Sequence, residues 1–80
     1  MVHTKITVYS TPSCPWCRKV KRYFKSLGVP FKDVDVSKNQ KKAQELYRKS
    51  GQMGVPVVIM GNQVIVGFDK NKIDKILGVS

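Results

Sequence analysis

The chain is poor in cysteine and in long apolar runs, and each shortage excludes a class of protein. Two cysteines among 80 residues exclude a disulfide-rich scaffold. The longest apolar run, Val55 to Met60, is far too short to cross a membrane, and the first residues lack the apolar core of a signal peptide. We therefore expect a cytoplasmic protein without a membrane partner, folded as a single domain over residues 1–80.

Acidic residues are also scarce, with five Asp and Glu against 15 Lys and Arg, which gives a formal net charge of +10. A charge of this size attracts acidic partners and binds nucleic acid loosely. The cations are spread over every predicted helix, and no aromatic–basic RNA-binding signature accompanies them. We expect solvated basic faces and no specific nucleic-acid partner. The alternative from another class is a basic module that binds nucleic acid or an acidic protein and leaves its cysteines idle.

Hydrophobic periodicity predicts seven elements in the order β-α-β-α-β-β-α. Strands are expected at 4–9, 31–36, 57–60 and 63–66, with the Gly61-Asn62 turn joining the last two as a hairpin. Helices are expected from Pro15 to the stop at Gly28, after a cap at Ser37 or Asn39, and after a cap at Asp69. Their predicted inner faces are Cys17, Val20, Tyr23, Phe24 and Leu27; Ala43, Leu46 and Tyr47; and Ile73, Ile76 and Leu77.

The order of the elements predicts the fold class. An opening βαβ unit implies a parallel pair of strands joined by a right-handed crossover, and the hairpin adds antiparallel strands. Helices must cover such a sheet to bury its apolar side chains. We expect an α/β protein with a four-stranded mixed sheet covered by three helices.

The two cysteines stand in the stretch SCPWCRK, where the first strand hands over to the first helix. Cys14 then takes the N-cap position and Pro15 the first helical position, with Cys17 one turn later on the same face. Residues three apart in a helical turn have Cα atoms about 5–6 Å apart, which is within the range of a disulfide. The spacing predicts a redox pair that closes without backbone movement.

Position also distinguishes the two sulfur atoms. A thiolate at Cys14 can accept the free N–H groups of Trp16 and Cys17 at the positive end of the helix dipole, which favours the anion. Arg18 and Lys19 add cations to the same turn and are predicted to favour the thiolate further. Cys14 is therefore the predicted nucleophile, and Cys17, inside the helix, is the predicted resolving thiol.

Two other interpretations of the cysteines are weaker. Buried inert cysteines are common elsewhere, but the helix-start position argues against them. A zinc site needs four ligands, and beyond the two cysteines the chain offers only His3, so we expect no metal. His3 is predicted to end the first strand in solvent, and Trp16 is predicted to lie half exposed beside the sulfurs and shape a docking surface.

These motifs resemble those of the glutaredoxin-like proteins of the thioredoxin superfamily. The resemblance is carried by ITVYSTPSCPWC, KSGQMGVPVVIMGNQVIVGFD and the terminal helix, and it covers nearly all 80 residues. It implies the thioredoxin/glutaredoxin fold and a monomeric thiol–disulfide oxidoreductase that reduces protein or mixed glutathione disulfides through Cys14 and Cys17. The resemblance implies that this activity requires no cofactor, with glutathione as a possible reductant. The alternative within this class is a hydrogen-donor redoxin, for example for ribonucleotide reductase, recharged by thioredoxin reductase.

The resemblance also implies a substrate site. It places a cis Pro56 opposite the cysteines, with the Val55 backbone free to pair with an extended substrate. Gly67 is either a strand-ending glycine or a point of close approach for a ligand backbone, and the second interpretation is favoured. The residues implied to bind substrate are Pro15, Trp16, Val55, Pro56, Gly67, Phe68 and Asp69.

Overall fold

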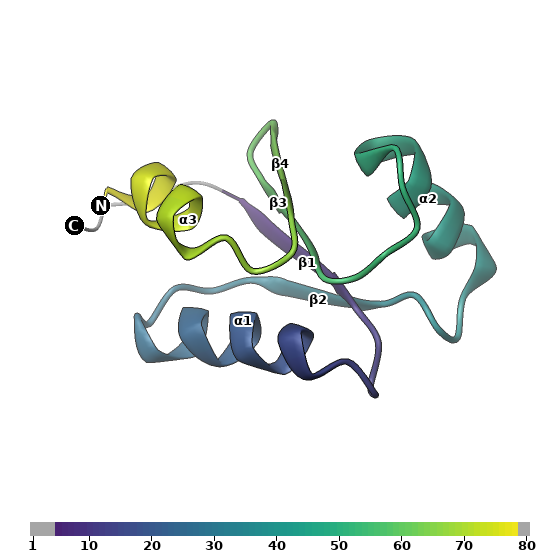
Figure 1. Ribbon diagram of the computed structural model, residues 1–80, viewed down its shortest axis with the longest axis horizontal. Coiled ribbons are helices and arrows are strands. Elements are labelled where there is room, and N and C mark those ends of the chain that lie inside the picture. The colour runs from purple at the N-terminus through teal and green to yellow at the C-terminus, as the bar shows by residue number, and fades with distance from the viewer. Residues whose placement is uncertain (1–4, 79–80) are drawn as a thin grey trace.

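The computed structural model describes residues 5–78 and contains the seven predicted elements in the predicted order (Figure 1). The expected strand and helix positions are confirmed, apart from small shifts at the ends of the first two strands. His3 and Thr4 lie outside the described residues. The elements are β1 (Ile6–Ser10), α1 (Pro15–Ser26), β2 (Lys32–Asp35), α2 (Gln40–Ser50), β3 (Val57–Met60), β4 (Gln63–Val66) and α3 (Lys70–Leu77).

The four strands form one mixed sheet in the order β2-β1-β3-β4, which confirms the predicted fold class. The interior strand β1 pairs in parallel with β2 and antiparallel with β3. In the antiparallel pairing Tyr9 lies opposite Val57, and in the β3–β4 hairpin Val57 lies opposite Val66. This register brings the end of β1, the start of β3 and the end of β4 to the same end of the sheet.

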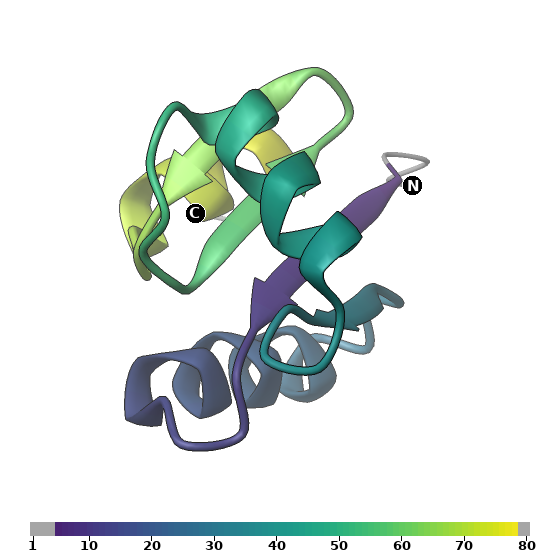
Figure 2. The same ribbon diagram turned by 90° about the vertical axis from the view of Figure 1, so that its right-hand side faces the viewer.

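Helices cover both faces of the sheet, with α1 and α3 on one face and α2 on the other (Figures 1 and 2). Side chains alternate along each strand, so Val8 points to the first face and Tyr9 to the second. None of the described helices has the length and apolar character of a membrane span. The first face buries Ile6, Val8, Val20, Phe24, Val58, Met60, Ile65, Ile73 and Leu77, and the second buries Tyr9, Val34, Leu46 and Val57.

The predicted inner face of α2 is wrong at one position. Leu46 is fully buried, but the side chain of Tyr47 is 54% exposed. The helix begins at the predicted cap Asn39, whose side chain accepts the Lys42 N–H at 3.2 Å. Glu45, on the other side of Leu46, accepts a hydrogen bond from the Tyr9 hydroxyl at 2.8 Å. Because this contact turns the Glu45 side of α2 toward the sheet, Tyr47 is turned into solvent.

Replacing Leu46 by alanine tests this orientation of α2. We expect Leu46→Ala to lower the free energy of unfolding by about 2–5 kcal/mol, because it leaves a cavity in the second core cluster. The matched control is Tyr47→Ala, one position along the same helix, which we expect to change that free energy by no more than about 0.5 kcal/mol. Urea unfolding of the reduced proteins measures both values, and equal losses would contradict the described orientation.

Candidate active site

Cys14 occupies the N-cap of α1, as predicted. Its backbone is extended, with φ −92° and ψ 112°, and Pro15 follows as the first helical residue. The Cys14 Sγ accepts the Cys17 N–H at 3.1 Å. Trp16, the second predicted donor, makes no hydrogen bond to this sulfur among the described contacts. The sulfur therefore replaces the oxygen of an ordinary N-cap at the positive end of the helix.

The two thiols differ sharply in exposure. Cys14 is partly exposed, whereas Cys17 is completely buried at the start of α1. Burial, followed by the hydrogen bond with the Cys14 side chain, raises the pKa of the Cys17 thiol to about 11. The Thr11 backbone and the Lys21 ammonium group act in the opposite direction and favour the Cys17 thiolate. The site thus contains one accessible sulfur and one that is protonated and shielded at neutral pH.

Lys21 is a residue of this site that sequence reasoning missed. It follows Cys17 by four positions and so lies on the same face of α1. Its ammonium group forms an ion pair with Asp33 on β2 at 2.9 Å and donates to the Ser10 hydroxyl at 3.4 Å. The buried Ser10 donates in turn to Asp33 at 2.7 Å. The four-residue spacing was the available signal, but the partners that hold Lys21 in place come from two strands.

The cations Arg18 and Lys19 make contacts other than the predicted one. The Arg18 guanidinium donates to the Pro12 carbonyl at 3.0 Å, and the Lys19 ammonium lies 4.3 Å from the centre of the Trp16 ring. Neither side chain contacts the Cys14 sulfur among the described interactions. Arg18 braces the loop before the helix and Lys19 holds the indole, while their influence on the thiolate through space stays a prediction.

The Val55-Pro56 segment faces the cysteines at this end of the sheet. Its peptide bond is cis, in agreement with the family resemblance, and Pro56 is buried. The Cys14 thiol donates to the Val55 carbonyl at 3.9 Å. This weak contact joins the loop that follows β1, which contains Cys14, to the loop that precedes β3, which contains Val55.

Five of the predicted substrate-binding residues line one groove of about 280 Å³: Trp16, Val55, Pro56, Gly67 and Phe68. Trp16 is 56% exposed, as expected for a docking residue. Pro15 and Asp69 are not among the lining residues. Pro15 is exposed at the start of α1, and Asp69 caps α3 by accepting the Lys72 N–H at 3.2 Å.

Gly67 directly follows β4, as expected of a strand-ending glycine, and its role as a point of close approach for a ligand stays a prediction. Its φ of +79° favours glycine by itself, since side chains strain the backbone in that region. Its N–H donates to the Pro56 carbonyl at 2.8 Å, which ties the end of β4 to the cis-proline segment. A Cβ atom at Gly67 would meet no atom within 4 Å, so the space beside it is open to a ligand.

The chemistry available to these groups is that of a dithiol. Both cysteines are free thiols, held one helical turn apart. Within residues 5–78, no three His, Cys, Asp or Glu side chains are grouped as a metal site. A partly exposed sulfur with a buried sulfur behind it can exchange with an outside disulfide to form a mixed disulfide, which the buried sulfur can then replace with an internal disulfide.

Comparison with known proteins agrees with this geometry. The Glutaredoxin family model matches residues 6–65. A glutaredoxin-like 8.6 kDa protein of the rubredoxin operon of Clostridium pasteurianum is 47% identical over 72 residues, which cover 90% of this chain and 96% of that protein. Glutaredoxin 3 of Escherichia coli is 31% identical over 64 residues, 80% of this chain and 77% of that protein.

The solved structure of the NrdH-redoxin of Escherichia coli is also similar. It has a TM-score of 0.81 and 29% sequence identity, over 90% of this chain and 93% of that one. The family match spans most of the chain, including both cysteines and the cis proline. The chain belongs to the glutaredoxin family of thiol–disulfide redox proteins.

Proposed function

We propose that this protein reduces disulfides of other proteins, or mixed disulfides with glutathione, by a two-thiol mechanism. The observation that supports it most directly is the difference between the two sulfurs. Cys14 is accessible and accepts a backbone N–H at the start of α1, whereas Cys17 is buried and its pKa is raised to about 11. One thiol can therefore meet a substrate while the other is held back until a mixed disulfide has formed.

In the first step the Cys14 thiolate attacks one sulfur of the substrate disulfide. The substrate S–S bond breaks, its second sulfur leaves as a thiolate that takes up a proton, and Cys14 is joined to the substrate. In the second step Cys17 loses its proton and attacks the Cys14 sulfur. The sulfur of the substrate that was joined to Cys14 leaves as a thiolate and takes up a proton, so the substrate disulfide has been reduced to two thiols by two electrons, and a Cys14–Cys17 disulfide remains. The Thr11 backbone and Lys21 assist this step, because they favour the Cys17 thiolate.

The groove beside Cys14 is the proposed docking surface. An extended substrate segment would lie between Trp16 and Phe68 and pair with the Val55 backbone. Phe68 is held in place by Tyr23, with ring centres 5.6 Å apart. The scheme uses only the two thiols and requires no organic cofactor or metal, and a single chain contains all the groups it needs.

The electron donor is the finer part of the proposal, and we propose that glutathione fits poorly. Many glutathione-using relatives carry a lysine three residues before the first cysteine, where this chain has Thr11. Their basic residue before Thr-Val-Pro is replaced by Met53, and the threonine itself by Gly54. Each lost charge-assisted contact would weaken glutathione binding about tenfold or more.

The segment after β4 supports the same conclusion. The Gly-Gly pair and the two acids of glutathione-using relatives are reduced here to Gly67 and Asp69. The Gly67-Phe68 pair resembles the reductase-dependent hydrogen donors, and the similar NrdH-redoxin of Escherichia coli is a glutaredoxin-like protein with a thioredoxin-like activity profile. We therefore propose that a flavoprotein of the thioredoxin reductase type recharges this protein at least as well as glutathione.

Alkylation of the reduced protein tests the roles of the two thiols. We expect iodoacetamide at pH 7 to label Cys14 at least about a hundredfold faster than Cys17, because a thiol with a pKa near 11 is almost entirely protonated there and Cys17 is also buried. Mass spectrometry of quenched samples measures both rates. In urea the two rates should converge, and equal rates in the folded protein would contradict the assignment.

Serine variants test the order of the two steps. Cys17→Ser leaves the first attack intact but removes the resolving thiol, so we expect mixed disulfides with a protein substrate to accumulate. Cys14→Ser should trap none, since the buried Cys17 cannot reach the substrate. Non-reducing electrophoresis after incubation with oxidised insulin measures the adducts, and trapping by Cys14→Ser alone would reverse the roles.

Two coupled assays test the electron donor. We expect insulin reduction driven by NADPH and thioredoxin reductase to proceed at a rate equal to or above the reduction of a glutathionylated peptide driven by glutathione and glutathione reductase. Rapid turnover in the second assay with none in the first would contradict the proposed donor. Inactivity in both, even with dithiothreitol, together with salt-sensitive DNA retention, would favour the basic binding module.

A further inference from the structure

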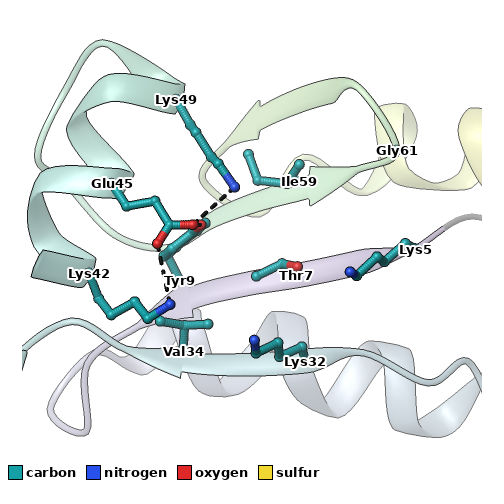
Figure 3. A pocket seen from close by; sticks show the side chains of 10 residues that line it. All are labelled: Lys5, Thr7, Tyr9, Lys32, Val34, Lys42, Glu45, Lys49, Ile59 and Gly61. Atoms are coloured by element: carbon teal, nitrogen blue, oxygen red, sulfur yellow. Dashed lines mark hydrogen bonds and ion pairs between the residues drawn. The ribbon is translucent and has the colours of Figure 1, made fainter.

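A second cavity, of about 220 Å³, lies on the face of the sheet that α2 partly covers (Figure 3). Strand alternation brings Lys5, Thr7 and Tyr9 to this face, and the pairing of Thr7 with Lys32 and with Ile59 adds the neighbouring strands. The helix covers only the Tyr9 end, so the rest of the face stays open beside it. The cavity is lined by Lys5, Thr7, Tyr9, Lys32, Val34, Lys42, Glu45, Lys49, Ile59 and Gly61.

The α2 side of this cavity is an organised cluster of charges. The Glu45 carboxylate accepts the Tyr9 hydroxyl at 2.8 Å and pairs with Lys49 at 3.1 Å and with Lys42 at 3.4 Å. These contacts, the Tyr9 bond first, lower the pKa of Glu45 to about 2, so the carboxylate is ionised at any physiological pH. Glu45 draws both ammonium groups toward the sheet, where Figure 3 shows them above Tyr9 and Val34.

The opposite side of the cavity has cations with no acidic partner. Lys5 and Lys32 form no ion pair with any carboxylate in the part of the chain that the structure describes. Four ammonium groups and one carboxylate line the cavity, which leaves three excess positive charges at a single concave site. The chain is basic throughout, but a merely solvated face would separate like charges, whereas here the fold gathers them around a hollow.

We propose that this cavity binds a small polyanion that carries two linked phosphate groups. Lysine ammonium groups act as point charges toward phosphate, and the Thr7 hydroxyl can donate a further hydrogen bond. At about −1.5 to −2 per phosphate group, a diphosphate matches the three excess positive charges of the site. Val34 and Ile59 give the floor an apolar part on which an organic group attached to the diphosphate can lie.

The site is separate from the thiol chemistry. Lys5 precedes β1, and Cys14 follows the other end of the same strand. None of the residues that line this cavity lines the groove beside Cys14. Substitutions at the cavity should therefore leave disulfide reduction unchanged, which separates a failure of this proposal from a failure of the redox function.

The test is a calorimetric titration of the full chain with sodium pyrophosphate at 150 mM NaCl. The pocket variant is Lys5→Gln with Lys32→Gln, and the matched control is Lys25→Gln with Lys75→Gln on α1 and α3, which removes the same net charge from exposed positions. We expect saturable one-to-one binding by the unmodified protein. The pocket variant should bind about tenfold more weakly or worse, and the control should stay within about twofold.

Two further measurements locate the site and identify the ligand class. Amide NMR shifts on adding pyrophosphate should be largest around Thr7, Ile59 and Gly61, and orthophosphate should bind about tenfold more weakly. All variants should reduce insulin with dithiothreitol at the rate of the unmodified protein. No saturation at millimolar pyrophosphate, equal losses in both variants, or shifts elsewhere would overturn the proposal. A short DNA duplex that shifts these amides when pyrophosphate does not would overturn it in favour of a nucleic-acid surface.

Discussion

The candidate active site depends on the antiparallel pairing of β1 with β3. With Tyr9 opposite Val57, the loop that leaves β1 and the loop that enters β3 must emerge side by side at one end of the sheet. The hairpin then returns β4 to the same end of the sheet, with Val66 opposite Val57. Three segments far apart in the sequence thus meet around one sulfur. Their contacts are the Cys14 thiol on the Val55 carbonyl and the Gly67 N–H on the Pro56 carbonyl.

Local patterns were sufficient to predict the elements and the position of the cysteines. Strand alternation at Ile6 and Val8 reported the buried face directly, and Pro15 marked the start of α1, which fixed Cys14 as its cap. These signals depend on neighbours within one or two turns, so they can be read without knowing the tertiary structure. The order of the elements then restricted the topology to one sheet with a parallel and an antiparallel part.

Contacts between distant segments decided the features that sequence could not predict. The rotation of α2, which exposes Tyr47, depends on a hydrogen bond between residues 36 positions apart, Tyr9 and Glu45. Arg18 and Lys19 have long side chains whose charged ends can reach several partners. In the folded chain Arg18 contacts the Pro12 carbonyl and Lys19 contacts the Trp16 ring. Lys21 gained its role from Ser10 and Asp33 on two strands. Sequence spacing places a side chain on one face of a helix, but it does not show which distant groups that side chain will contact.

The two edges of the sheet have unequal protection against pairing with another molecule. Edge strands present unpaired backbone groups that can template a further strand, and short length and charged side chains oppose this. Both edges, β2 and β4, are only four residues long, and β2 also exposes Lys32 and Asp33. The β4 edge instead exposes Val64 and Val66. At that edge the repulsion between strongly basic molecules is the main barrier to aggregation, so concentrated salt, which screens this repulsion, removes protection from β4 first.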